Sequence, residues 1–333
     1  MQLEIIAEIA QGFEGCKEQA RLLVQAAASS GANSVKFQLV YADELATPDY
    51  EYYKLFSDLE MHDEDWIKIK STCDSYNVEL ILDIFGKKSL ALAELLNLKT
   101  IKVHATDINN ISFLENISSS SIERVLLGAG GAVKKELKKA VDILNSKKIV
   151  LLHGFQGYPT PLESNQLSRI HQFRKIFKGI ENVSIGLSDH IDPDSSTSIS
   201  LPSFAFGMGV KVIEKHLTLG KCMKMEDYES ALNPDQFEIF VNSMRDINTS
   251  FGQSKPDEDF GMTDSELDYR VAIRRHVVTT KKIEKGDKIT TDAVTLKRTS
   301  SQNTAHDISV FFNQTSNKAL DKNKAITIED IQK

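Results

Sequence analysis

This sequence of 333 residues has few cysteines, no net positive charge and no long hydrophobic runs. The three cysteines, Cys16, Cys73 and Cys222, are far apart and odd in number, which predicts free thiols in a reducing cytoplasm and excludes a disulfide framework. The formal net charge of −7 provides no general basic field for nucleic acid. No apolar run reaches the roughly 18–20 residues that span a bilayer, and the N-terminus has no signal-peptide pattern. We therefore expect a cytoplasmic protein that binds neither nucleic acid nor membrane.

Short apolar runs rich in β-forming residues are what the sequence does contain, and helical patterns separate them. The eight runs span residues 3–9, 34–40, 78–84, 100–105, 124–130, 149–155, 183–189 and 211–217. The helical patterns lie at residues 17–31, 63–76, 87–97, 133–145, 164–178, 195–208 and 235–248. Strands that alternate with helices pair in parallel through βαβ units. Eight such units in about 250 residues favour a (β/α)8 TIM barrel, with a doubly wound open sheet as the alternative.

The pattern changes near residue 250. Residues 252–266 are polar and contain glycine, proline and acidic residues, which is typical of a linker. Short β-like pieces follow, among them HVVTTKKI and AVTLKR. We predict a TIM-barrel domain at residues 1–255, a linker at 256–273 and a small, mainly β domain at 274–333. A domain of this size is near the lower limit for independent folding, so we expect it to dock on another surface.

Polar residues gather near the C-terminal ends of the predicted strands, where TIM barrels place their sites. In chain order they are Glu8, Lys36, Gln38, Lys102, His104, Asp107, His153, Gln156, Tyr158, Ser188, Asp189, His190, Glu214, Lys215 and His216. A structural ion pair or a hydrogen-bonded core histidine would explain any one of them alone. Isolated charges are costly to bury, however, and here they recur at one end of six strands. The convergence predicts a polar, anion-binding site.

Two histidines, His190 and His216, end strands that are neighbours in a barrel. Two imidazoles on adjacent strand ends can share a divalent metal, with Asp189, Glu214 or water completing the ligands. A structural histidine pair held by carboxylates explains the same positions. The spacing leaves both interpretations open.

Seven stretches match a known family in order and distance. They are AEIAQGFEG (7–15), GANSVKFQ (31–38), IKVHATD (101–107), LLHGFQGYPTP (151–161), GLSDH (186–190), VIEKHLTL (212–219) and EDYESALNPDQF (226–237). The sequence resembles the sialic acid synthase family, bacterial enzymes that condense phosphoenolpyruvate with an acylated amino-hexose. Residues 274–298 resemble that family's C-terminal antifreeze-like (SAF) module.

The resemblance implies a role for each candidate residue. The metal, usually manganese with magnesium or cobalt as alternatives, would be held by His190 and His216, while Glu214 and Lys215 would be supporting or outward-facing residues. Lys36 and Lys102 would bind the carboxylate and phosphate of phosphoenolpyruvate. The remaining substrate-binding residues would be Gln38, Gln156, Tyr158, Ser188 and Arg298, and the catalytic residues Glu8, Asp107 and Asp227.

The implied reaction is nonulosonic (sialic-acid-like) acid synthesis. The metal would polarise the sugar aldehyde, and C3 of phosphoenolpyruvate would attack it. Water would add at C2 with Glu8 or Asp107 as the base, and phosphate would leave with C–O cleavage. The family forms a domain-swapped homodimer in which the SAF module covers the partner's barrel. Arg298 would then contact the sugar, although a solvated surface residue would also explain it.

Several positions depart from the family pattern. Asp83 stands where the family has a threonine, Gly128 lacks the usual hydroxyl, and His104 replaces a small residue. Asp83 would repel a phosphate unless it is turned away or paired with a lysine, and His104 is a candidate third metal ligand or phosphate contact. Two alternatives follow from these departures: a metal-dependent aldolase that uses a sugar and pyruvate, and a non-catalytic carbohydrate-binding relative. The loop at 41–61 has four tyrosines, which would stack on a sugar or pack on the barrel rim.

Overall fold

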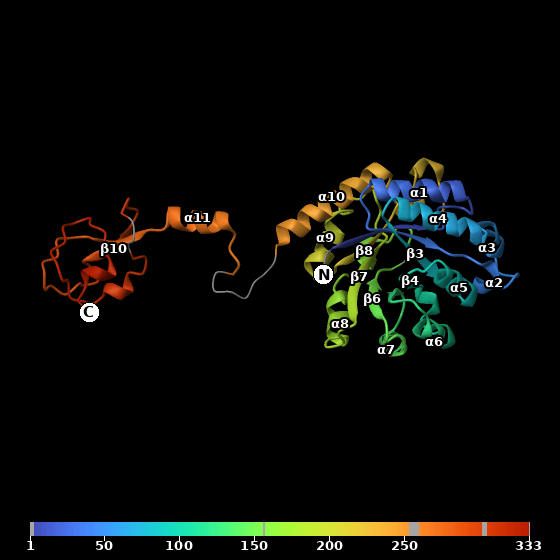
Figure 1. Ribbon diagram of the computed structural model, residues 1–333, viewed down its shortest axis with the longest axis horizontal. Coiled ribbons are helices and arrows are strands. Elements are labelled where there is room, and N and C mark those ends of the chain that lie inside the picture. The colour runs from blue at the N-terminus through green and yellow to red at the C-terminus, as the bar shows by residue number, and fades with distance from the viewer. Residues whose placement is uncertain (1–2, 156, 253–259, 302–304, 333) are drawn as a thin grey trace. The chain divides into compact units, whose positions relative to one another are not determined.

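Eight parallel strands form a closed barrel in the computed structural model, which describes residues 3–155, 157–252, 260–301 and 305–332 (Figure 1). The strands are β1 (Glu4–Ala10), β2 (Ser34–Gln38), β3 (Glu79–Ile84), β4 (Thr100–Val103), β5 (Arg124–Gly128), β6 (Lys148–His153), β7 (Val183–Asp189) and β8 (Val212–His216). Each strand pairs with the next along the chain, and β8 closes the barrel against β1, with Glu8 opposite His216. The predicted (β/α)8 barrel is confirmed, and the open sheet is excluded.

Helices surround the strands (Figure 1). They are α1 (Lys17–Ser29), α2 (Ala42–Leu45), α3 (Tyr53–Leu59), α4 (Asp63–Ser75), α5 (Lys87–Leu95), α6 (Ile111–Ser119), α7 (Lys134–Ile143), α8 (Arg169–Ile176), α9 (Ser200–Gly207) and α10 (Pro234–Phe251). The sequence did not predict α6, because the serines that end it mask its short apolar face of Phe113, Leu114 and Ile117. None of the helices in the described part of the chain combines the length and the apolar composition needed to cross a bilayer.

Two layers of side chains fill the barrel domain. The main apolar core lies between strands and helices and includes Leu23, Trp66 and Phe237. A second apolar layer lies inside the barrel and consists of Ile6, Ile81, Leu126, Val150, Leu152 and Val212. Because side chains alternate along a strand, the residues two positions beyond this inner layer also point into the barrel. On β8 these are Glu214 and then His216.

The chain divides into two compact units, residues 1–252 and residues 253–333. The second unit contains α11 (Asp264–Ile273) and an antiparallel pair, β9 (His276–Thr279) with β10 (Val294–Lys297). Its apolar core is formed by Val277, Ile283, Ile289, Ala293, Val294, Phe311, Leu320 and Ile326. The segment predicted as a linker therefore includes a helix. Its signal was Thr263 followed three residues later by Glu266, whose side chain accepts hydrogen bonds from the Thr263 amide and hydroxyl.

Candidate functional site

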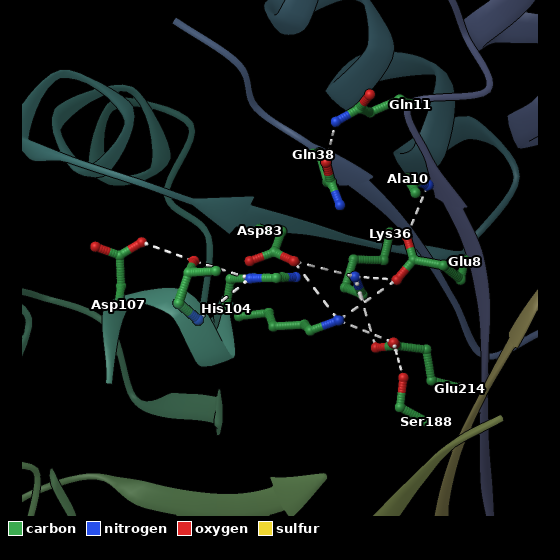
Figure 2. Close-up of polar contacts among 12 residues, drawn as sticks. Glu8, Ala10, Gln11, Lys36, Gln38, Asp83, His104, Asp107, Ser188 and Glu214 are labelled. Atoms are coloured by element: carbon green, nitrogen blue, oxygen red, sulfur yellow. Dashed lines mark hydrogen bonds and ion pairs between the residues drawn. The ribbon is translucent and has the colours of Figure 1, made fainter. Parts of the chain in front are cut away.

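Five charged side chains meet inside the barrel, one layer above the inner apolar core. They are Glu8, Lys36, Asp83, Lys102 and Glu214, which we call the central charged cluster (Figure 2 labels all but Lys102). All five are buried, and Lys36 and Asp83 have no exposed surface. They come from β1, β2, β3, β4 and β8, so the barrel register brings together residues up to 206 positions apart, from Glu8 to Glu214.

Each lysine of the cluster contacts all three carboxylates. Lys102 Nζ lies 2.9 Å from Glu214 Oε1, 3.5 Å from Asp83 Oδ2 and 3.8 Å from Glu8 Oε2. Lys36 Nζ is in close contact with Glu8 Oε2 and lies 3.7 Å from Asp83 Oδ2 and 3.6 Å from Glu214 Oε2. Asp83 is therefore paired with both lysines. Such pairing is one of the two arrangements in which an aspartate at this position would not repel a bound phosphate.

Protonation makes the cluster close to neutral. Burial raises the pKa of Glu8 to about 8, against the opposing effect of the Lys36 charge. Burial opposes ionisation of Glu214 too, but Lys102 and Lys36 outweigh it and hold its pKa well below the usual value. For Lys102, burial disfavours the charge, yet Glu214, Asp83 and Glu8 keep its pKa well above the usual value. With Glu8 protonated, two lysines face two carboxylates.

Glu8→Gln is expected to remove a pH dependence of stability. The pKa of Glu8 is about 8 in the folded protein against an unperturbed value of 4.5. Its stabilising contribution is fully present below about pH 4.5 and is lost as the pH rises through about 8. The free energy of unfolding of the wild type should therefore fall relative to the variant by up to about 1.4 kcal/mol per pH unit in that window. Urea unfolding at several pH values measures this, and a difference that does not change with pH would show that Glu8 is ionised throughout.

Hydrogen bonds hold the carboxylates of the cluster in place. Ser188 Oγ donates to Glu214 Oε1 at 2.6 Å, and the amide of Ala10 donates to Glu8 Oε1 at 2.7 Å. Nearer the mouth, Gln11 Nε2 donates to Gln38 Oε1 at 2.8 Å (Figure 2). Ser188 and Gln38 thus lie where the sequence placed them, on the inner side of β7 and β2.

Two neutral imidazoles lie at the ends of β7 and β8. The ring centroids of His190 and His216 are 4.9 Å apart, and the ring of Tyr158 packs edge-on against them at 5.3 and 5.8 Å. Burial lowers the pKa of His190 to about 4, and burial together with neighbouring His190 holds the pKa of His216 well below its usual value. The Nδ1 of His190 lies 3.2 Å from the carbonyl oxygen of Ser188. A hydrogen bond from Nδ1 to this carbonyl leaves Nε2 as a lone-pair donor.

The donor chemistry of this pair fits a divalent metal. Neutral imidazole is the ligating form of histidine, and the partner of His190 is a carbonyl rather than a carboxylate. Within the described ranges, no group of three or more histidine, cysteine, aspartate or glutamate side chains forms a metal cluster. His104 is therefore not a third ligand of the pair; its Nδ1 contacts Thr106 Oγ1 at 2.9 Å. The other positions on a metal would be left to water or substrate.

The buried strand VIEKHLTL carries three ionisable residues because they face two different layers. Glu214 and His216 point into the barrel, whereas Lys215 points outward and pairs with Asp189 at 2.8 Å. Both members of that outer pair are buried. Of the two roles expected for Glu214, supporting or outward-facing, the outward-facing one is wrong, because Glu214 contacts Lys102 and Ser188 inside the barrel. The sequence could have predicted this direction, since side chains alternate along a strand and Glu214 lies on the same face as His216.

Two predicted residues, Asp227 and Asp107, lie on the segments that follow β8 and β4 rather than on the strands themselves. Asp227, on the loop after β8, has its pKa raised to about 7 by burial and by Glu226 and Glu229. Asp107 accepts a hydrogen bond from Asn110 at 3.0 Å and lies beyond His104, away from the central charged cluster (Figure 2). It lines a separate cavity of about 670 Å³ under the loop at 41–61, together with Tyr50 and Phe56.

Gln156 and Arg298 are the other predicted substrate-binding residues. Gln156 lies outside the described residues. Arg298 is exposed in the second unit, directly after β10. His153, which the sequence grouped with the strand-end residues, points outward from β6 toward α8, where its ring packs edge-on against Phe173 at 5.8 Å.

The absence of a side chain at Gly128 has a steric cause. A Cβ atom there would lie 2.9 Å from the amide nitrogen of Ala105, and one at Gly154 would lie 2.2 Å from the carbonyl oxygen of Ser188. These glycines allow the ends of β4, β5, β6 and β7 to approach closely beside Lys102. A hydroxyl-bearing residue at 128 would push β4 and β5 apart.

Comparison with known proteins agrees with this architecture. The profile of the NeuB family matches residues 23–256. An uncharacterized protein of Methanocaldococcus jannaschii is 30% identical over 297 residues, covering 88% of this chain and 84% of that protein. The N,N'-diacetyllegionaminic acid synthase of Legionella pneumophila is 28% identical over 317 residues, covering 88% and 85%. The sialic acid synthetase of Leptospira borgpetersenii, solved in complex with citrate, has a TM-score of 0.72 and 25% identity, covering 82% and 93%. The chain belongs to the NeuB family.

Proposed function

We propose that the protein is a nonulosonic acid synthase that condenses phosphoenolpyruvate with an N-acylated amino-hexose and releases phosphate. The observation that carries the proposal is the meeting of two buried lysines, Lys36 and Lys102, one layer below a pair of neutral histidines at the barrel mouth. Homologues named as legionaminic and sialic acid synthases support the same reaction class. The aldolase and non-catalytic alternatives are not favoured, because neither needs both a lysine pair and a metal-type histidine pair.

Each group of residues would have its own task. Lys36 and Lys102 would bind the carboxylate and phosphate of phosphoenolpyruvate, exchanging contacts with Asp83 and Glu214 for contacts with the substrate. Glu8, whose pKa of about 8 leaves part of it ionised near neutral pH, would accept the proton released by the water that adds at C2. Asp227 would contact the sugar from the rim. His190 and His216 would hold a divalent cation, for which manganese is our choice, and this ion would supply Lewis-acid polarisation of the sugar aldehyde.

Phosphate release tests the proposal. The purified protein is incubated with phosphoenolpyruvate, manganese and, one at a time, N-acetylmannosamine, a 2,4-diacetamido-trideoxyhexose and a plain hexose. We expect release that requires one N-acylated amino-hexose and stops on addition of EDTA. Turnover of the sugar with pyruvate and without phosphate release would instead identify the aldolase.

Asp83→Asn is expected to increase the affinity for phosphoenolpyruvate about tenfold, which corresponds to about 1.4 kcal/mol. Asp83 Oδ2 lies 3.7 Å from Lys36 Nζ and 3.5 Å from Lys102 Nζ, so its charge competes with the substrate for both lysines. Glu4→Gln is the control, because it removes a carboxylate that pairs with Arg124 at the opposite end of the strands. Calorimetric titration measures both variants, and weaker binding in Asp83→Asn would contradict a competing role.

We propose also that residues 274–333 form an SAF module and that two chains form a domain-swapped homodimer in which Arg298 serves the partner's barrel. Mixing two inactive or impaired variants tests the swap. Lys102→Met damages only the barrel, and Arg298→Ala damages only the second unit. In mixed swapped dimers, one barrel of every heterodimer is intact and meets an intact Arg298, so activity is restored. Without a swap, every site in the mixture keeps one defect and the activity does not rise.

A further inference from the structure

A cavity of about 700 Å³ lies outside the barrel strands, between α7 and α8. Its volume is in the range of small-molecule sites in proteins. The apolar part of its wall comprises Leu137 of α7, Phe173 and Ile176 of α8, and the adjoining Phe155 and Phe177. The polar part comprises Lys134, Glu163, Gln166, Arg169 and Gln172. The central charged cluster and the histidine pair are not among its lining residues, so we name it the α7–α8 cavity and treat it as a separate site.

A buried histidine contributes a polar group to the wall of the α7–α8 cavity. The inner layer of the barrel contains Val150 and Leu152, so alternation along β6 turns His153 to the outer side. Its Nε2 lies 2.8 Å from the carbonyl oxygen of Asn165. Burial, with the nearby charge of Arg169, lowers the pKa of His153, so the ring is neutral at physiological pH. Its Nε2–H donates to that carbonyl, so the ring can accept a hydrogen bond at Nδ1 and adds no charge.

The charges around the cavity have a positive excess. Lys134 and Arg169 are exposed at the rim, and within the described residues neither side chain forms an ion pair or a hydrogen bond. Glu163 is the only acidic lining residue among those described, which leaves one net positive charge. We propose that the α7–α8 cavity is a second ligand site, which binds a small amphiphilic anion: an aromatic or alkyl body against the phenylalanines, with one carboxylate, phosphate or sulfonate group between Lys134 and Arg169.

The loop after β6 connects this site with the barrel mouth. Phe155 and Glu163 line the α7–α8 cavity, and Tyr158, which lies between them in the chain, packs against His190 and His216. Gly130 and Gly154 line both this cavity and a small cavity beside Lys102. A ligand in the α7–α8 cavity therefore contacts the same loop that carries Tyr158.

The test uses 8-anilinonaphthalene-1-sulfonate, an aromatic sulfonate whose fluorescence increases in an apolar site. We expect saturable binding to the full-length wild type and at least tenfold weaker binding to Gln172→Trp, which fills the cavity. Lys175→Trp places the same side chain at a position of α8 that does not line the cavity, and this variant should bind the dye as the wild type does. Arg169→Gln keeps the cavity open and removes one charge, and we expect about fivefold weaker binding.

Hydrogen exchange locates the bound dye. We expect slower amide exchange in the peptide that covers residues 157–166 of the wild type when the dye is present, and no slowing in Gln172→Trp. The proposal is overturned if the wild type does not bind the dye, if Gln172→Trp and Lys175→Trp bind it equally, or if protection falls on another segment. Equal affinity in Arg169→Gln and wild type would overturn the assignment of an anionic ligand. None of these measurements depends on synthase activity, so the proposed function can fail or hold independently.

Discussion

Lys102→Met is expected to lower phosphoenolpyruvate-dependent phosphate release about a thousandfold, because it removes a charged donor aimed at the reacting anion. It is also expected to reduce the free energy of unfolding by about 3 kcal/mol, since buried Glu214 would lose the nearer of its two lysines, at 2.9 Å, and keep only Lys36 at 3.6 Å. Phosphate-release kinetics and urea unfolding measure the two effects. Together they test whether one lysine serves both binding and the fold.

Two further variants separate these roles. Arg124→Met removes a cation that pairs with Glu4 at 2.6 Å at the N-terminal end of the strands, where TIM barrels have stability roles. It should lose stability and keep the phosphate-release activity. The double variant Lys102→Met with Glu214→Gln removes both charges, so its stability loss should be smaller than the sum of the two single losses. Additive losses would contradict a coupled buried pair, and full activity in Lys102→Met would contradict its role in substrate binding.

His216→Ala is expected to weaken manganese binding by at least about a hundredfold and to remove the metal-dependent activity with it. The expectation rests on the 4.9 Å spacing of the two imidazole rings and on their neutral, ligating form. Manganese binding is followed by the loss of its free electron paramagnetic resonance signal, which does not require turnover. His153→Gln is the matched control, because it changes a buried histidine that points away from the barrel interior. Equal manganese affinity in the wild type and His216→Ala would reject the pair as the metal site.

The order of the strands and part of the inward set of polar residues could be predicted from the sequence. Apolar runs at regular spacing fixed the eight strands, and period-2 alternation placed Lys36 and Gln38 on one face. The pairing of Asp83 with both lysines could not be predicted in the same way, because it depends on the register of β2, β3 and β4 across the barrel. A single local pattern cannot show whether a carboxylate at a strand end faces a phosphate or a lysine.

Loop residues were the least predictable part of the site. Asp107 lies only five positions beyond Lys102, yet the η1 turn (Ala105–Asp107) directs it to the cavity under the loop at 41–61. The tyrosines of segment 41–61, which contains α2 and α3, also differ in their environments. Tyr41 is buried and donates a hydrogen bond to Asp63, whereas Tyr50 lines the cavity. The direction of a side chain in a turn depends on the local backbone angles. Because turns have no regular residue period, the sequence pattern does not predict that direction.

Calorimetric titration with phosphoenolpyruvate alone tests the central claim most directly, because it needs no knowledge of the acceptor sugar. The central charged cluster is predicted to bind one equivalent of phosphoenolpyruvate per chain in the wild type, and Lys36→Met is predicted to bind at least about a hundredfold more weakly. Arg124→Met should bind as the wild type does. Absence of binding in the wild type, or equal affinity in the wild type and Lys36→Met, would contradict the assignment of the cluster as the phosphoenolpyruvate site.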